Sequence, residues 1–188
     1  FSWLICSTLE EMINSTNEIY QKKWLSLIQK IPTPIKPIQI EKETRHITLA
    51  YFDQKSTVDY IGAVQGIPVC FDAKECHTDT FPLANIHQHQ VAFMKDFEKQ
   101  GGISFFLLFY TNRNEMYYLS LAKLLIFYDR AEQGGRKSFL LSEIEKEYQI
   151  YQEGMAFVHY LPLIQKDLLE REEKDKKVIH WQKKREKL

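Results

Sequence analysis

Apolar positions recur at intervals of three and four residues in the first part of the chain, between residues 7 and 29. This spacing is typical of a helix that buries one face. The stretch STLE supplies a helix start, with Ser7 as the cap and Glu10 three residues later. The pattern therefore predicts a first helix over residues 7–29.

A proline-rich segment follows this helix. Pro32, Pro34 and Pro37 remove backbone donors and favour extended geometry, so a helix cannot continue there. The stretch from about residue 31 to residue 56 is long for a simple connection. We expect it to form an extended hairpin that projects from the body.

The rest of the pattern alternates strands and helices. STVDYIGAV and IPVCF are rich in β-branched and aromatic residues and flank a QG turn, which predicts two adjacent strands. An apolar helical face runs from Leu83 to Phe97 and ends at Gly101-Gly102. ISFFLLFY and MYYLSL predict a strand pair around TNRNE. This order predicts an α/β fold, with a sheet that carries helices against its faces.

Composition limits the domain count and the class of partner. A length of 188 residues with 44% hydrophobic content fits one domain with a real core. We expect a single domain over residues 1–171 and a charged tail over residues 172–188, which forms a frayed helix or a disordered segment. Lys+Arg and Asp+Glu are equal at 25 each, so any site for a polyanion has to be a local patch.

Cysteine usage and hydropathy indicate the compartment. The three cysteines include no CxxC pair, which is typical of reduced thiols in the cytoplasm. No apolar run approaches the roughly 18–20 residues of a membrane span, and FSWLIC lacks the charged start and the length of a signal peptide. We expect a soluble cytoplasmic protein with no membrane partner.

Charged residues interrupt two segments that otherwise read as buried strands. In a hairpin, Asp59 near the start of one strand comes close to Asp72 and Lys74 near the end of the next. A divalent cation would offset the charge of the carboxylates, and Mg²⁺ suits such hard oxygen ligands. The pattern is typical of metal-dependent phosphodiester hydrolysis, with Lys74 beside the attacking water. A strand-end turn with a surface ion pair is the alternative.

Two helical residues extend this set. Glu10 shares a polar stripe with Asn14 and Asn17, so it is either a third carboxylate for the metal or the capping-box partner of Ser7. Gln90 stands in the apolar face of the second helix, where a polar side chain needs a partner. It either bonds backbone near the site, contacts the substrate or is a satisfied core glutamine.

The spacing Asp, then Asp-x-Lys after one strand-turn-strand, resembles the PD-(D/E)xK nuclease superfamily. An ordered set of motifs across roughly residues 9–165 is similar to the RecU family of Holliday junction resolvases: LEEMINSTNEIY, PTP, AYFDQKSTVDYIG, FDAKE, TFPLANIHQHQ and GGRKS. The set is far more specific than Asp-x-Lys alone. The resemblance implies a restriction-endonuclease-like fold, with a mixed central sheet flanked by helices and a protruding stalk hairpin. It also implies a homodimer that cuts a four-way DNA junction with Mg²⁺, with Mn²⁺ as the alternative metal.

The resemblance also assigns site residues. Glu10, Asp59 and Asp72 match the family's catalytic, metal-holding acids, Lys74 matches its catalytic lysine, and Thr57 falls in the same matched motif as Asp59. Two features depart from the family. The second acid is usually Glu where this chain has Asp72, and FSWLICST replaces a basic N-terminal arm.

Further DNA contacts are predicted on two segments. Arg136 and Lys137 in GGRKS form either a phosphate-binding turn or a helix-ending turn with solvated cations. On the hairpin, Lys36, Lys42 and Arg45 either touch phosphates or are solvated edge charges. Zinc is not predicted, because the Cys and His spacing fits no standard ligand pair.

These observations predict a homodimeric, structure-selective endonuclease that resolves Holliday junctions in DNA recombination and repair, in contact with other recombination proteins. A dimer presents two identical sites to two strands related by the same symmetry. One alternative is a nuclease that acts on another DNA structure. The other is a recombination protein that binds junctions without cutting them.

Overall fold

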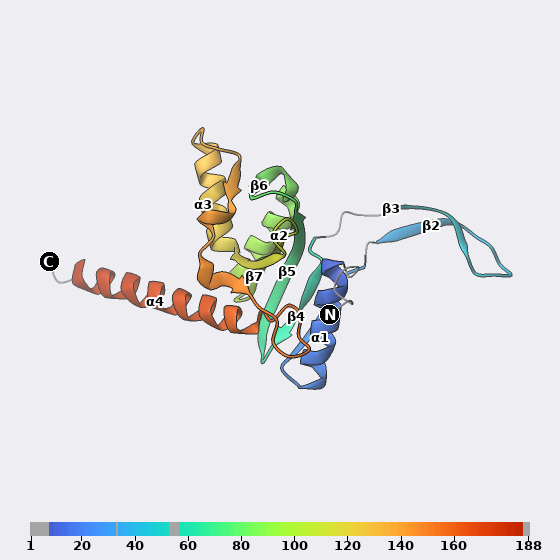
Figure 1. Ribbon diagram of the computed structural model, residues 1–188, viewed down its shortest axis with the longest axis horizontal. Coiled ribbons are helices and arrows are strands. Elements are labelled where there is room, and N and C mark those ends of the chain that lie inside the picture. The colour runs from blue at the N-terminus through green and yellow to red at the C-terminus, as the bar shows by residue number, and fades with distance from the viewer. Residues whose placement is uncertain (1–7, 33, 53–56, 186–188) are drawn as a thin grey trace.

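The computed structural model describes residues 8–32, 34–52 and 57–185 (Figure 1). Its centre is a six-stranded sheet in the order β1-β4-β5-β7-β8-β10. Neighbouring strands are antiparallel except β5 and β7, which are parallel. The mixed α/β sheet predicted from the sequence is therefore confirmed. The strands are β1 (Ser26–Lys30), β4 (Tyr60–Val64), β5 (Ile67–Cys76), β7 (Ile103–Tyr110), β8 (Glu115–Ser120) and β10 (Gln149–Ile150).

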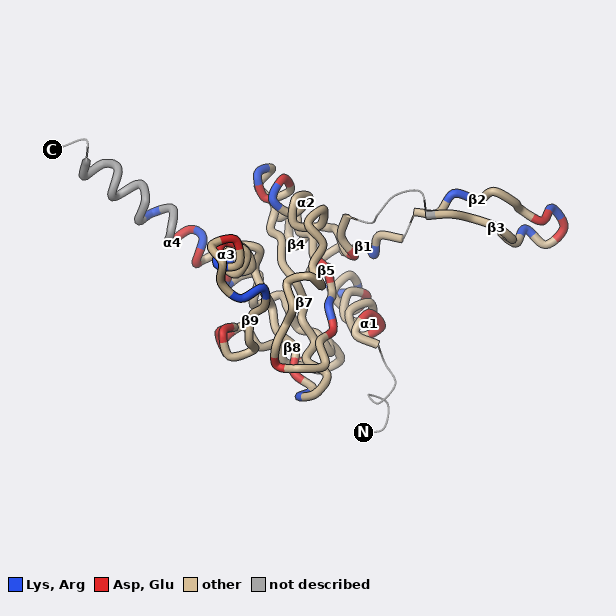
Figure 2. The backbone as a smooth tube through the Cα atoms, turned by 90° about the horizontal axis from the view of Figure 1, so that it is seen from above, with Lys and Arg blue, Asp and Glu red and all other residues tan. Residues whose placement is uncertain are grey.

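The described residues form four α-helices, of which α1, α2 and α3 pack against this sheet and α4 extends away from it (Figure 1). α1 contacts β1 and β5, whereas α2 and α3 contact β7 and one another. Figure 2 shows α1 and α3 on opposite sides of the sheet. A small second sheet pairs β6 (Thr80–Pro82) with β9 (Ser138–Leu140). The helices are α1 (Leu9–Lys22), α2 (Gln88–Lys99), α3 (Leu121–Glu132) and α4 (Leu161–Arg185).

An aromatic stack crosses the middle of the sheet and fixes its packing. Tyr60, Phe71, Phe105 and Tyr118 come from four successive strands, and neighbouring ring centroids lie 4.5–4.8 Å apart. All four side chains are almost completely buried. Each such ring buries a large apolar area, so a shift of register would expose several of them at once. The stack therefore holds the strands that carry the predicted site.

The first helix is shorter than predicted, and its cap lies one residue later. Thr8 caps α1 and Glu11 completes the capping box, so the predicted pairing of Ser7 with Glu10 is wrong, and Ser7 itself lies outside the described residues. The helix ends at Lys22, and a turn over residues 23–25 and then β1 replace the rest of the predicted helix. Its apolar residues belong to a strand that pairs with β4, because a short apolar run fits either element.

The second helix also starts later than predicted. Residues Leu83–Asn85 form a short 3₁₀ turn, and α2 begins at Gln88. The predicted end is confirmed, since the left-handed backbone of Gly101 follows the helix.

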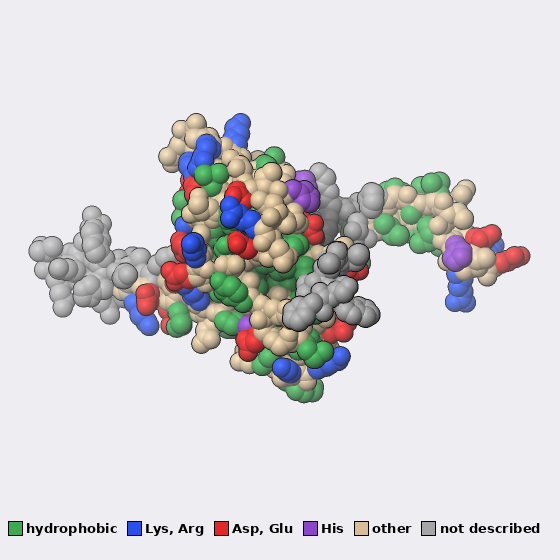
Figure 3. Space-filling model, in the orientation of Figure 1, with side chains coloured by type: hydrophobic (Ala, Val, Ile, Leu, Met, Phe, Trp, Pro, Cys, Tyr) green, Lys and Arg blue, Asp and Glu red, His purple; other side chains and the backbone are tan. Residues whose placement is uncertain are grey.

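The proline-rich segment forms a two-stranded hairpin of β2 (Ile35–Ile40) and β3 (Ile47–Phe52). Figure 1 shows it reaching away from the sheet, as predicted. Every described side chain of β2 is exposed. Figure 3 shows apolar side chains along much of its length, and Figure 2 shows charges of both signs near its tip.

The C-terminal segment is a continuous helix. α4 runs from Leu161 to Arg185, so the predicted boundary between residues 171 and 172 falls inside it. None of the helices in the described part of the chain combines the length and the apolar composition that a membrane span requires.

Gly62 of β4 gives a test of this packing. A Cβ atom at this position would lie 2.0 Å from the Leu27 carbonyl oxygen and 2.8 Å from the Ile28 Cα. Because backbone cannot move aside easily, we expect Gly62→Ala to lower the free energy of unfolding by about 2 kcal/mol or more in urea titrations. Gly102→Ala is the matched control, since its Cβ would meet only the side chain of Phe97. A Gly62→Ala variant as stable as the unmodified chain would show that β1 packs less closely on β4.

Candidate active site

The hairpin of β4 and β5 brings two carboxylates together. Tyr60 faces Phe71 in the register of the two strands. Asp59 precedes Tyr60 and therefore comes opposite Asp72. The Asp59 Oδ2 accepts a hydrogen bond from the Ala73 amide at 3.0 Å. This contact holds the Asp59 carboxylate beside β5. The sequence predicts this closeness of Asp59 to the β5 residues Asp72 and Lys74.

Asp72 is the buried centre of the group, with a side chain that is 0% exposed. Gln90 donates from Nε2 to its Oδ1 at 2.7 Å. The Lys74 ammonium forms an ion pair with its Oδ2. Apart from this ammonium, Oδ2 has no hydrogen-bond donor among the described residues. A buried carboxylate oxygen with unused acceptor capacity is a position that a cation can satisfy.

The surroundings of Asp72 change its acidity. Burial and, to a smaller extent, the neighbouring Asp59 carboxylate together raise the pKa of Asp72 from 3.8 to about 7 against the opposing effect of the Lys74 ammonium. Burial disfavours the charged form because the interior solvates a carboxylate poorly, and a second negative charge adds to this cost. Near neutral pH and without a bound cation, Asp72 is therefore present in both its protonated and its charged form.

Lys74 lies two residues beyond Asp72 on the same face of β5, as strand alternation predicts. Its side chain is 20% exposed, whereas Asp72 is fully enclosed. The ammonium therefore lies between the buried carboxylate and solvent. A group in that position can reach a phosphate or a water that approaches from outside.

Gln90 connects α2 to this group. It is 5% exposed, and its Oε1 accepts from the His87 amide at 3.3 Å while its Nε2 contacts Asp72. Both ends of the amide are thus engaged inside the protein. At the site, Gln90 bonds the Asp72 side chain and not the backbone as predicted, and its contact with DNA stays a prediction.

Glu10 lies at the edge of the same region. Because Glu11 and not Glu10 completes the capping box, the Glu10 carboxylate is available for another role. It is 45% exposed and forms an ion pair with Lys30 at the end of β1. Glu10 and Asp59 both line a cavity of about 240 Å³ between α1 and the β4–β5 hairpin.

Glu75 is a site residue that the sequence reasoning missed. It lines the same cavity, and its Oε1 accepts from the Leu9 amide at 3.3 Å. Through this bond β5 holds the first turn of α1, and so it holds Glu10 beside Asp59. The motif FDAKE already pointed to this residue, because Glu75 directly follows Lys74 in it.

The oxygen-rich donor set fits a hard divalent cation in its chemistry. Asp59 and Asp72 are neighbours, and Asp72 offers a buried oxygen without a hydrogen-bond partner. As they are oriented, no three Asp, Glu, His or Cys side chains of the described residues form a metal-binding group. Glu10 faces Lys30 instead, so it would have to turn to join the two aspartates.

Comparisons with known proteins identify the family of the chain. The family model described as RecU, Recombination protein U, matches residues 6–166. The chain belongs to the RecU family. Proteins named Holliday junction resolvase RecU are 39% identical over 164 residues in Pediococcus pentosaceus and 42% identical over 162 residues in Lactococcus lactis subsp. lactis. These matches cover 85% and 84% of this chain and 82% and 75% of the relatives.

The residues predicted to contact DNA lie apart from one another on this RecU family member. Thr57 is exposed two residues before Asp59, at the edge of the acidic group. Lys36, Lys42 and Arg45 are exposed on the β2–β3 hairpin. Their contacts with DNA stay predictions.

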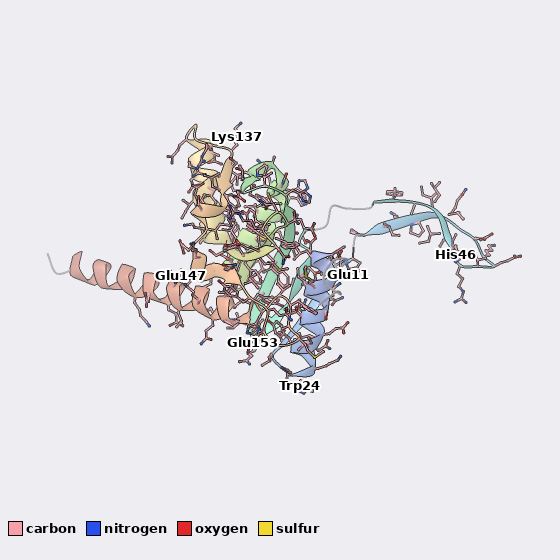
Figure 4. The ribbon with its side chains drawn as sticks, viewed as in Figure 1. Glu11, Trp24, His46, Lys137, Glu147 and Glu153 are labelled. Atoms are coloured by element: carbon pink, nitrogen blue, oxygen red, sulfur yellow. The ribbon has the colours of Figure 1, made fainter. Side chains whose placement is uncertain are left out.

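The GGRKS turn ends a helix. Gly134 adopts a left-handed backbone after α3, and the Gly135 amide donates to the Arg130 carbonyl at 2.9 Å. Arg136 pairs with Glu143 at 2.8 Å, whereas Lys137 is exposed. The structure thus supports the helix-ending interpretation. A phosphate contact by Arg136 or Lys137 stays a prediction, and Figure 4 labels Lys137 at the α3 end of the molecule, away from Glu11.

The raised pKa of Asp72 predicts how stability depends on pH. Without metal, the folded state holds the Asp72 proton more tightly than the unfolded state between pH 3.8 and about 7. Stability therefore falls as pH rises through this window. Asp72→Asn removes the titrating group, so we expect its stability relative to the unmodified chain to increase by about 2–3 kcal/mol from pH 5 to pH 8, measured by urea unfolding in EDTA.

Asp96→Asn is the matched control, because Asp96 is 73% exposed on α2. It should leave the difference between pH 5 and pH 8 unchanged. Equal pH dependence in the Asp72→Asn variant and the unmodified chain would contradict a raised pKa at Asp72.

Proposed function

We propose that this RecU family member is a structure-selective endonuclease that resolves Holliday junctions by paired phosphodiester cleavage in recombination and repair. The observation that carries the proposal is the buried Asp72 beside Asp59 and Lys74. Family membership supports it, because curated relatives about 40% identical over most of the chain are named Holliday junction resolvases. The site supplies the two carboxylates, of Asp59 and Asp72, and the ammonium group of Lys74 that such hydrolysis uses.

The proposed cofactor is Mg²⁺, with Mn²⁺ as the alternative. Asp59 and Asp72 would hold it, and Glu10 would join them after leaving Lys30. A bound Mg²⁺ supplies a polarised phosphoryl oxygen and a more acidic water. Support for this choice comes from the hard oxygen donors and the buried Asp72 oxygen that lacks a hydrogen-bond partner.

The chain's own residues have distinct roles in this proposal. Asp72 provides a fixed negative charge whose orientation is set by Gln90. Asp59 is positioned through the Ala73 amide. Lys74 is 20% exposed beside the buried Asp72, so it would neutralise charge on the phosphate or orient the water.

The proposed architecture is a restriction-endonuclease-like nuclease domain over residues 1–171, a stalk over about residues 31–56 and a charged tail over residues 172–188. The six-stranded mixed sheet and the projecting hairpin support the first two parts. The stalk would enter the junction, where Lys36, Lys42 and Arg45 would contact phosphates and make binding sensitive to salt. Selectivity would then come from junction shape and not from base edges.

Paired cleavage calls for two active sites, so we propose a cytoplasmic homodimer that works with other recombination proteins. A two-fold dimer offers identical sites to symmetry-related strands. Thr57, Gln90, Arg136 and Lys137 complete the proposed contacts with DNA. Of these, Gln90 has the weakest support for direct contact, because it is buried.

A cleavage assay tests the proposal. The purified protein should introduce symmetric nicks into a synthetic mobile four-way junction with Mg²⁺, and none in EDTA. Asp59→Asn keeps an acceptor for the Ala73 amide but loses the charge, so we expect junction binding to persist while nicking falls at least about 100-fold. Asp96→Asn, an exposed aspartate of α2, should cut normally.

The same assay separates the alternatives. Equal cutting of linear duplex or flap DNA would indicate a nuclease with another substrate. Junction binding by the unmodified chain without any nicking in Mg²⁺ or Mn²⁺ would indicate a recombination protein that does not cut.

A further inference from the structure

Two histidines lie at the start of α2, close to the acidic group of the candidate active site. His87 directly precedes the helix, and His89 belongs to its first turn. Their rings stack, with centroids 5.4 Å apart and planes inclined by 13°. Because His87 is exposed and His89 is half-buried, this histidine pair lies at the surface of the protein.

Gln90 connects the histidine pair to the buried carboxylate. Its Oε1 accepts from the His87 backbone amide at 3.3 Å, and its Nε2 donates to the Asp72 Oδ1 at 2.7 Å. A single carboxamide therefore bridges the backbone of His87 and the Asp72 carboxylate. α2 packs against β7, which is the neighbour of β5 in the sheet (Figure 1). The histidine pair thus belongs to the same packed framework as the acids.

The surroundings of the pair favour a negatively charged partner. No Asp or Glu occurs between Asp79 and Asp96 in the sequence, and His87 forms no ion pair with any described residue. The segment thus lacks the carboxylate that commonly orients a metal-binding histidine.

The side chains beside the pair are hydrogen-bond donors as well. Asn85 and Gln88 are exposed and carry amide groups. Imidazole and amide N–H groups can both donate to a phosphate oxygen, which only accepts. The donors around the histidine pair therefore suit the backbone of a nucleic acid.

The short connection to Asp72 indicates which phosphate the pair can reach. In the proposed reaction, the phosphate that is cut lies beside Asp72 and Lys74. Successive phosphates of one strand are about 3.4 Å apart along the helix axis. The backbone of His87 is one carboxamide away from Asp72, so a phosphate one or two nucleotides from the cut would lie at the histidines.

We propose that His87 and His89 bind a phosphate of the strand that is cut, one or two nucleotides from the cleaved bond. The inference rests on the proposed nuclease function and deepens it, because this contact would keep the cleaved phosphate in place beside Asp72 and Lys74. Both histidines are binding residues, and no chemical step passes through them. A contact to a backbone phosphate carries no sequence information of its own.

Binding of a fluorescent synthetic four-way junction in EDTA tests the contact without cleavage. His87→Phe and His89→Phe keep an aromatic ring for the stack but remove the donors, so we expect each to raise the Kd about 5- to 10-fold, measured by anisotropy. His77→Phe is the matched control, since His77 is exposed beyond the end of β5 and bonds to Thr111. Its Kd should equal that of the unmodified chain. Circular dichroism and the thermal midpoint verify that each variant is folded.

Junctions with one neutral phosphate each locate the contact. A methylphosphonate is placed in turn at every position around the branch point, and each junction is titrated with the unmodified chain and with His87→Phe. At one position the unmodified chain should lose about as much affinity as the substitution costs, and His87→Phe should lose nothing more there. A histidine that only supports the fold would weaken binding to every junction of the series by the same factor.

Two results would overturn the proposal: an unchanged Kd in both phenylalanine variants, or a loss that persists at every methylphosphonate position. Cleavage by the same samples in Mg²⁺ separates the inference from the proposed function. A chain that binds through the histidine pair but never cuts would support the contact and reject the nuclease. A chain that cuts junctions while its histidine variants bind normally would support the nuclease and reject the contact. A chain that binds no junction would reject both.

Discussion

A carboxylate buried in the middle of a sheet is the constraint around which this protein is arranged. Placing the Asp72 charge in the interior costs several kcal/mol unless other groups offset it. Gln90 from α2 donates to it, and Lys74 supplies a positive charge from the same strand. The aromatic stack that includes Phe71 holds β5 in place, so the carboxylate cannot escape to solvent. Such a group is retained at a cost to stability, which is typical of functional sites.

Much of this site could be predicted from the sequence, because it depends on local geometry. A strand hairpin with a short turn fixes which residues face each other, so the meeting of Asp59 with Asp72 follows from spacing alone. The alternation of side chains places Lys74 beside Asp72 for the same reason. Gln90 was detectable as a polar residue in an apolar helical face, although its partner was not.

Other features depend on contacts that spacing does not encode. The cap of α1 lies at Thr8 and not at Ser7, and a shift of one residue turns a helical side chain by about 100°. Glu10 is therefore free of the cap and meets Lys30, which is distant in sequence. The segment around Leu27 has apolar spacing that suits a helix, yet it completes the sheet against β4. The choice between helix and strand is decided only by the tertiary pairing of this segment with Gly62 of β4. A side chain at position 62 would collide with the backbone of Leu27 and Ile28.

Asp72 is a buried acid beside a second carboxylate, and we propose that it exchanges its proton for a divalent cation. Carbon-13 NMR of the Asp72 carboxyl group across a pH titration tests it most directly, with Asp96 as the internal reference. We expect a pKa of about 7 for Asp72 without metal and a value well below that in Mg²⁺. A pKa near that of an ordinary aspartate, unchanged by Mg²⁺, would contradict it.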